Sequence, residues 1–141
     1  MVSITWSDGC LSLKISYDLF KIKGYNFELE LRPRTIILKN YSRYRVGTDQ
    51  RRKYVYVYFD EKIKPLDKCD QFLEIKGVRY IDSYEFRYTR TFYDEYYTIV
   101  VPGIFYIEYI ILSSTKLGIV LSKKREVYFE ETSEYLIIYI V

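Results

Sequence analysis

The sequence contains no histidine and no alanine, and it has only two cysteines among 141 residues. Without histidine, the chain lacks the side chain that most often serves as a general base near neutral pH and most often binds metals. Ser–His and Cys–His nucleophile pairs are excluded for the same reason. Because alanine is the best helix former, its absence also disfavours helices. These absences remove the commonest catalytic centres and point away from a helical fold.

Glycine and cysteine are too sparse for the usual phosphate and zinc motifs. The six glycines are scattered and form neither GxxxxGK[ST] nor GxGxxG, so no phosphate-cradling loop is expected. Cys10 and Cys69 lie far apart without a CxxC motif, which excludes an ordinary zinc site. They are either two free thiols or one disulfide. We therefore expect neither a metal nor a cofactor.

Long hydrophobic runs are missing as well. The most apolar run, residues 98–112, is too short to span a bilayer and is interrupted by Pro102, Gly103 and Glu108. The first residues lack a basic segment followed by an apolar core, so no signal peptide is predicted. We expect a soluble protein that does not insert into membranes.

Tyrosine dominates what is present, with 18 residues, alongside 8 phenylalanines and abundant isoleucine. Such side chains favour strands over helices. Half of the chain is apolar and 29% is charged, which is typical of a folded protein, and the net charge is only +3. We predict a single all-β domain over residues 1–141, an antiparallel β-sandwich or barrel-like fold of about ten short strands, with a jelly roll as one option.

The clearest local pattern is a hairpin over residues 2–16. Asp8-Gly9 is a favoured two-residue turn, and it would place Trp6 opposite Leu11 and Ile4 opposite Leu13. All large apolar side chains then share one face. Further alternating or apolar stretches predict strands at residues 19–23, 26–32, 71–76, 78–92, 96–101, 104–112, 117–122, 126–131 and 134–141.

Residues 34–59 are predicted to form one long hairpin with a cationic tip. With residues 47–52 as the loop, Arg45 would lie opposite Tyr54 and Arg43 opposite Tyr56. Arginine and lysine neutralise phosphates, while tyrosine rings stack on unpaired bases. The candidate nucleic-acid-binding residues are Arg43, Arg45, Arg51, Arg52, Lys53, Tyr54 and Tyr56. The alternative is an ordinary wet sheet face on which arginine stacks on tyrosine.

Two weaker patterns concern catalysis. Glu74 and Lys76, preceded by Asp60, Asp67 or Asp70, resemble the D…ExK arrangement of restriction-type nucleases, which implies Mg²⁺. The same letters also describe surface charges on an amphipathic strand. Glu108 is a lone charge in an apolar run: a buried acid or base, the partner of Arg87 or Arg90, or the one wet position of its strand.

The composition resembles that of small orphan proteins of hyperthermophilic archaea or their viruses, because lysine, glutamate and arginine are plentiful while asparagine, glutamine and methionine are scarce. That resemblance implies a location in the cytoplasm of a host cell or in association with a virion. A genome rich in A and T would produce the same bias.

The apolar C-terminal segment EYLIIYIV would aggregate as an exposed edge, so it must be internal to a sheet or pair with another chain. We predict a non-enzymatic β-domain that acts by protein–protein interaction, as a structural, virion-type or host-interaction module. It would be a homo-oligomer or bind another protein. The alternative is a nucleic-acid-binding protein that uses hairpin 34–59, and a metal-dependent nuclease is the third reading.

Overall fold

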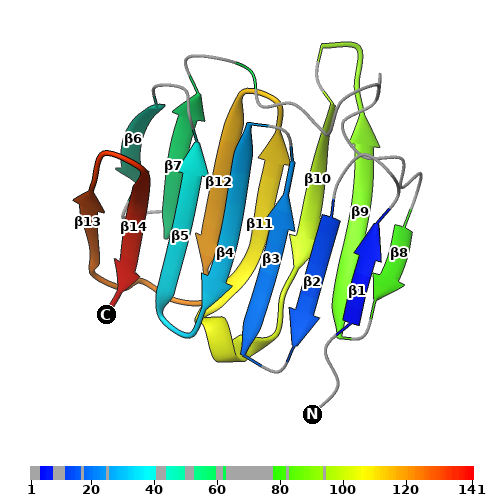
Figure 1. Ribbon diagram of the computed structural model, residues 1–141, viewed down its shortest axis with the longest axis horizontal. Helices are drawn as coiled ribbons and strands as arrows, with labels where there is room; N and C mark the ends of the chain where they lie inside the picture. The colour runs from blue at the N-terminus through cyan, green and yellow to red at the C-terminus, as the bar shows by residue number, and fades with distance from the viewer. Residues whose placement is uncertain are drawn as a thin grey trace. The chain divides into compact units, whose positions relative to one another are not determined.

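The protein consists of two antiparallel seven-stranded sheets in the computed structural model (Figure 1). The structure describes residues 4–7, 12–16, 18–24, 26–40, 44–49, 53–59, 62, 78–81, 83–93 and 95–141. Within these ranges no helix is long and apolar enough to cross a membrane. The predicted all-β class with antiparallel pairing is confirmed. The strands fall into two compact units, one for each sheet, and the single domain expected over residues 1–141 stays a prediction.

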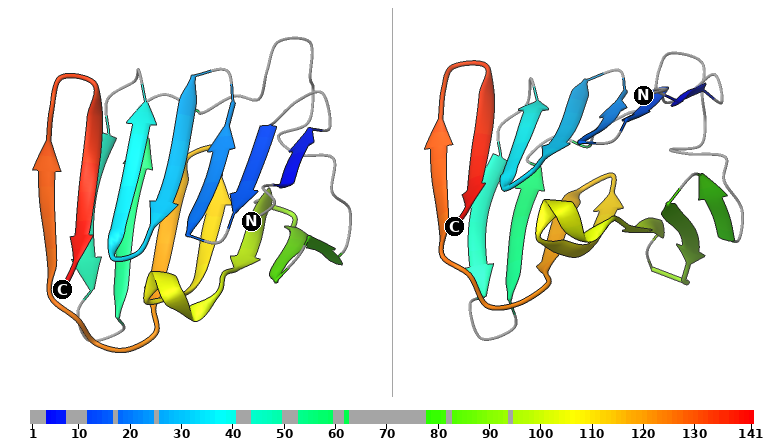
Figure 2. Two further views of the ribbon diagram at one scale, coloured as in Figure 1. Left: turned by 60° about the horizontal axis from the view of Figure 1, so that its bottom comes forward. Right: turned by 90° about the horizontal axis from the view of Figure 1, so that it is seen from below.

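The first sheet has the order β1-β2-β3-β4-β5-β14-β13. A meander from the N-terminal part of the chain supplies five of its strands, and the C-terminal hairpin supplies the other two (Figure 2). Its strands are β1 (Ile4–Ser7), β2 (Ser12–Ser16), β3 (Leu19–Lys23), β4 (Phe27–Arg32), β5 (Thr35–Asn40), β13 (Val127–Glu131) and β14 (Tyr135–Ile140).

The second sheet has the order β6-β7-β12-β11-β10-β9-β8. Hairpins connect most of its neighbours, and a 3₁₀ turn at Gly103–Phe105 leads into β11. Its strands are β6 (Tyr44–Asp49), β7 (Tyr54–Phe59), β8 (Val78–Ile81), β9 (Tyr84–Arg90), β10 (Glu95–Val100), β11 (Ile107–Ser113) and β12 (Lys116–Leu121).

Each sheet has one buried apolar face because its strands alternate apolar and polar side chains. In β4, Phe27, Leu29 and Leu31 are buried, while Glu28 and Glu30 between them are partly exposed. β7 repeats the pattern with Val55, Val57 and Phe59 buried between its tyrosines. Alternation with period two places every second side chain on the same face, so the polar positions line the opposite face.

The N-terminal hairpin exists, but the predicted register is wrong by two residues. β1 and β2 pair Trp6 with Leu13 and Ile4 with Ile15, and the ladder closes at Ser7 and Ser12. The connection therefore spans four residues instead of the two of Asp8-Gly9. An even shift leaves every side chain on its expected face, so alternation could not distinguish the two registers.

The single long hairpin over residues 34–59 is also wrong. β5 pairs with β4 and β14 in the first sheet, whereas β6 pairs with β7 in the second. The hairpin is thus limited to β6 and β7, where Arg45 lies opposite Tyr58 and Asp49 opposite Tyr54. Only three residues separate β5 from β6, so the pattern did not reveal that the chain changes sheets.

Residues 78–92 form two strands rather than one. β8 and β9 make a tight hairpin in which Ile81 pairs with Tyr84. β11, predicted as a strand over residues 104–112, occupies an interior place in its sheet, and only one of its faces is buried. Tyr109 and Ile111 on its other face remain partly exposed.

The C-terminal strand lies inside the first sheet. β14 is paired with β5 on one side and β13 on the other. Leu136, Ile138 and Ile140 are almost fully buried. The prediction that EYLIIYIV is internal to a sheet is confirmed, and β13 takes the edge position instead.

Candidate binding surfaces

Tyrosines line a hollow on the polar face of the second sheet. Tyr54, Tyr56 and Tyr58 follow one another along β7, with ring centroids 5.7 Å apart for the first pair and 5.3 Å for the second. Tyr109 and Ile111 of β11 and Lys116 and Val120 of β12 complete the lining of a volume of about 560 Å³. We call this surface the tyrosine hollow. None of its lining residues carries a carboxylate.

Lys116 lies close to the three tyrosine rings of β7 in the tyrosine hollow. Its Nζ lies 5.0 Å from the ring centroid of Tyr54, 6.0 Å from that of Tyr56 and 5.6 Å from that of Tyr58. These distances are within the range of cation–π attraction. The pairing of β7 with β12 sets this arrangement, because it places Lys116 opposite Tyr58 and Gly118 opposite Tyr56. One ammonium group is therefore held over three aromatic rings.

Gly118 makes room for the first ring of the hollow. An added Cβ at this position would collide with the hydroxyl of Tyr54 and lie 2.9 Å from its Cζ. Tyr54 thus lies across the backbone of β12 because residue 118 has no side chain. Any larger residue there would displace the ring from the hollow.

The predicted nucleic-acid-binding residues are only partly brought together. Tyr54 and Tyr56 line the tyrosine hollow. Lys53 is exposed beside it, in the left-handed region at φ 57°, with its carbonyl accepting a hydrogen bond from the Leu121 N–H. Arg45 lies on β6, where its backbone pairs with Tyr58 rather than with Tyr54 as predicted. Arg43, Arg51 and Arg52 lie outside the described residues.

Sequence reasoning missed Lys116 and Tyr109. Both belong to strands about fifty residues or more beyond β7, and only the β7–β12–β11 pairing brings them to the hollow. The usable signal was the interrupted apolar pattern of β11, where Tyr109 and Ile111 alternate with buried residues. The Lys123-Lys124-Arg125 turn has two exposed lysines, and the guanidinium of Arg125 lies 4.3 Å from the ring centroid of Tyr106.

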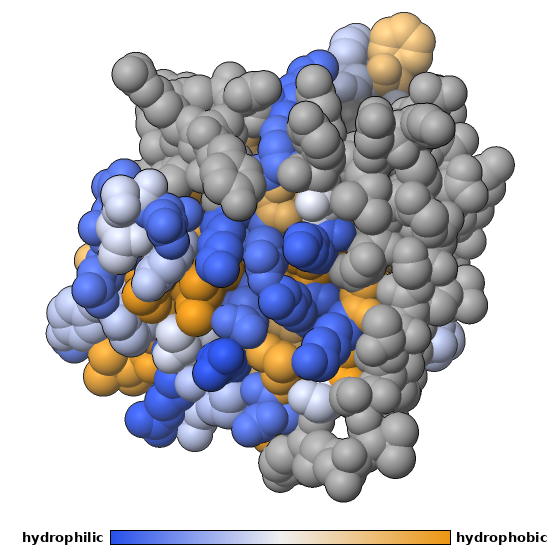
Figure 3. All heavy atoms as spheres, viewed as in Figure 1, coloured by the Kyte–Doolittle hydropathy of each residue, from blue (hydrophilic) through white to orange (hydrophobic). Residues whose placement is uncertain are grey.

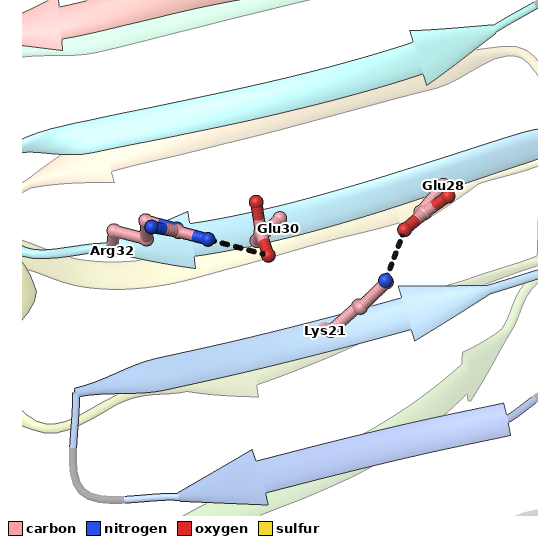
Figure 4. A network of polar contacts seen from close by, with 4 residues as sticks. All are labelled: Lys21, Glu28, Glu30 and Arg32. Atoms are coloured by element: carbon pink, nitrogen blue, oxygen red, sulfur yellow. Dashed lines mark hydrogen bonds and ion pairs between the residues drawn. The ribbon is translucent and has the colours of Figure 1, made fainter.

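Charged side chains cover the polar face of the first sheet, and some of them form ion pairs. Lys21 Nζ lies 2.5 Å from Glu28 Oε1 across β3 and β4, and Arg32 pairs with Glu30 at 3.4 Å along β4 (Figure 4). Hydrophilic residues gather over the same strands in the space-filling view (Figure 3). Lys39 Nζ also lies 6.0 Å from the ring centroid of Tyr135. The glutamates are outnumbered on this face, because the same alternation places Lys14 and Lys23 there as well.

β13 is an exposed edge strand. Of the strands that the structure describes, only β14 pairs with it. Tyr128 is 54% exposed and Phe129 is 40% exposed, although they alternate to opposite faces. The Val141 N–H bonds to the carbonyl of Glu126 and the Thr132 N–H bonds to that of Tyr135. The even-numbered residues of β13 therefore face β14, and the backbone N–H and C=O groups of Val127, Phe129 and Glu131 point outward.

Two tyrosines on this hairpin are tied to glutamates. Tyr139 donates a hydrogen bond from its hydroxyl to Glu130 Oε2 at 2.7 Å, and Tyr128 donates to Glu126 Oε2 at 2.8 Å. Each bond holds the proton on the phenol, so it raises the pKa of Tyr139 and of Tyr128 above the ordinary 10.0, with the nearby negative charge adding to the effect.

Glu130→Gln is expected to lower the pKa of Tyr139 towards 10.0, because the amide lacks the carboxylate charge. The raised pKa in the folded state stabilises the fold below about pH 10, and this contribution is lost as the pH rises through the folded pKa. The measurement is an NMR titration of ¹³C-labelled tyrosine. Glu131→Gln is the matched control, since Glu131 is on the opposite face of β13 from Glu130. An unchanged Tyr139 midpoint in Glu130→Gln would show that the bond does not form.

The residues considered for catalysis are placed as follows. Glu108 is exposed at a register irregularity between Ile107 and Tyr109, so it is the wet position of its strand and not a buried acid. Arg87 pairs with Glu85 at 3.0 Å. Glu74 and Lys76, together with Asp60, Asp67 and Asp70, lie outside the described residues, as do Cys10 and Cys69. In the described ranges no three metal-ligating side chains come together.

No known protein family, curated protein or solved structure matches the chain. The resemblance in composition to proteins of hyperthermophilic archaea or their viruses stays a prediction. The tyrosine hollow and the edge formed by β13 are the two surfaces that suggest a function.

Proposed function

We propose that the protein is a non-enzymatic β-domain that acts by protein–protein contact, with a second copy of the same chain bound along β13. The open edge of β13 carries this proposal. Unpaired backbone groups at a sheet edge are a template for another strand. Exposed Tyr128 and Phe129 add aromatic area on both faces of that edge, and tyrosine in particular is enriched among the residues that contribute most to interface affinity.

The outward backbone groups restrict how two copies can pair. In a two-fold symmetric antiparallel ladder, the outward groups of one β13 must meet the outward groups of the other. Val127, Phe129 and Glu131 must then lie opposite one another. This condition excludes registers displaced by one residue. It also keeps the buried faces of the first sheets of the two copies on the same side of the joined sheet.

Charge selects one of the remaining registers. When Phe129 lies opposite its own copy, Tyr128 lies opposite Glu130 of the other chain and Val127 lies opposite Glu131. A displacement of two residues in one direction places Glu130 opposite itself, and in the other direction places Glu126 opposite Glu130. Like charges directly opposite each other destabilise a strand pair. The favoured dimer therefore joins the first sheet of one copy to the first sheet of the other, with Phe129 at the symmetry axis.

Phe129→Lys is expected to convert a dimer into a monomer. A charged residue on the inward alternation of an edge strand is a natural block to edge pairing. Light scattering coupled to gel filtration at about 100 μM chain measures the change as a fall from twice to once the chain mass. Tyr93→Lys is the matched control, because Tyr93 is an aromatic residue 92% exposed on another hairpin, and this variant should remain dimeric.

A second variant keeps the test valid if the lysine disturbs folding. Val127→Pro removes an outward N–H at the first residue of β13 without removing a bond to β14, which proline at an edge permits. We expect this variant to be folded by circular dichroism and monomeric. A wild-type chain that is monomeric at 100 μM, or a folded Val127→Pro chain that is still dimeric, would refute the proposal.

A further inference from the structure

We propose that the tyrosine hollow binds single-stranded nucleic acid, with bases against the rings of β7 and a phosphate at Lys116. This site goes beyond self-association, because it lies on the face of the second sheet and not on β13. Its residues are those that line the volume of about 560 Å³ between β7, β12 and β11.

The spacing of the rings suits an extended strand of bases. The centroids of the three successive rings lie 5.7 Å and 5.3 Å apart. Successive bases of a stacked strand are about 3.4 Å apart, so the ring spacing matches a strand whose bases are partly unstacked. Tyr54, Tyr56 and Tyr58 can therefore each meet one successive nucleotide. The rings are tilted by 33° and 70° to each other, so each base has its own platform and no continuous stack is required.

The charge of the hollow suits a polyanion. Lys116 lies within 6.0 Å of all three ring centroids, and exposed Lys53 precedes the first ring. No lining residue is acidic. Base stacking together with a cation along the backbone is the usual basis of sequence-tolerant single-strand binding.

The polar face of the first sheet provides a contrast. It also carries a lysine near a tyrosine, Lys39 and Tyr135, at 6.0 Å. There, however, Glu28 and Glu30 line the neighbouring surface together with Lys21 and Arg32. This neighbouring surface has no aromatic lining residue, and its glutamates would repel phosphate. Binding that depends on stacked bases is therefore expected on the second sheet.

The test measures fluorescence anisotropy of labelled ten-nucleotide dT, ten-nucleotide U and a ten-base-pair duplex at 50–300 mM salt. We expect binding of the single strands and weaker binding of the duplex, whose bases cannot reach the rings. Tyr56→Ala should weaken single-strand binding about 5- to 150-fold, the range that loss of one stacked base gives. Lys116→Ala should lower the slope of log affinity against log salt by about 0.7, as loss of one phosphate contact does in single strands.

Two further variants separate the hollow from general charge. Lys39→Ala removes a lysine that also lies near a tyrosine ring, but on the other sheet, and it should leave binding unchanged. Gly118→Val should displace Tyr54 and weaken binding, while valine remains compatible with a strand. The affinities are compared at a temperature at which thermal unfolding curves show every variant to be folded.

Three results would overturn the inference. The first is no single-strand binding at 50 mM salt, and the second is an equal loss of affinity in Lys39→Ala and Lys116→Ala. The third is competition by poly-glutamate as strong as that by unlabelled dT, which would reveal a general anion surface. Because the hollow and β13 share no residue, a folded Phe129→Lys monomer that still binds dT supports the hollow independently of dimer formation.

Discussion

Phe86→Ala is expected to lower the free energy of unfolding by about 3–5 kcal/mol. Phe86 is fully buried on β9, where its neighbours in the ladder are Ile99 on β10 and Arg79 on β8. Deleting the ring removes its transfer free energy and leaves a cavity that a rigid sheet face refills only in part. The loss is large compared with the total stability of an ordinary domain, about 5–15 kcal/mol.

Denaturant unfolding followed by circular dichroism measures this change. Arg87→Ala is the control, since Arg87 is the next residue of β9 and lies on its exposed side. Its ion pair with Glu85 is on the surface, so its loss should cost about 1 kcal/mol or less. Equal effects of the two substitutions would contradict the assignment of the buried face of β9.

Ile138→Ala is expected to cost about 2–5 kcal/mol, whereas Ile137→Ala next to it should cost about 1 kcal/mol or less. The two side chains are identical, and only their alternation on β14 differs. Ile138 is fully buried between Ile36 and Phe129, while Ile137 is partly exposed on the polar face.

This pair of variants tests the interior position of β14 without a change of chemistry. The measurement is again the midpoint of denaturant unfolding. The two variants are compared only if the free energy of unfolding has the same slope against denaturant concentration in both. A larger loss for Ile137→Ala than for Ile138→Ala would mean that β14 presents its other face to the core.

Alternation in the sequence predicted the faces of strands well and their registers poorly. Phe27, Leu29 and Leu31 of β4 are buried as their spacing indicated. The register of β1 with β2 was wrong by two residues and that of β6 with β7 by four. Both shifts are even, so they move side chains along the strand without changing faces, and a period of two carries no information about them.

Long-range pairing could not be predicted from local patterns. Residues 34–59 look like one hairpin because β5 and β6 are close in sequence, yet they belong to different sheets. Lys116 was missed for the same reason, since its place beside Tyr58 depends on β12 pairing with β7. Tyr54 and Tyr56 were predicted from their expected pairing with Arg45 and Arg43, but Arg45 pairs with Tyr58 instead, and the hollow needs residues from two more strands.

Edge positions were predictable in part. The uncharged segment after Glu134 indicated an interior strand, and β14 has that place. β13, with Glu126 before it and Glu130 and Glu131 at its end, has the charges typical of an edge. The exposure of Phe129 could not be predicted from the sequence, because Phe129 is on the same face of the sheet as the buried Ile138 opposite to it.

Residue-resolved amide hydrogen exchange along β13 tests the proposed self-association most directly. The N–H groups of Tyr128 and Glu130 face β14, so they should be protected at every chain concentration. Those of Val127, Phe129 and Glu131 face outward and should become protected only as the concentration rises from about 1 μM to several hundred μM, with Phe129 at the centre. Fast exchange at these three positions over the whole range would contradict pairing through β13.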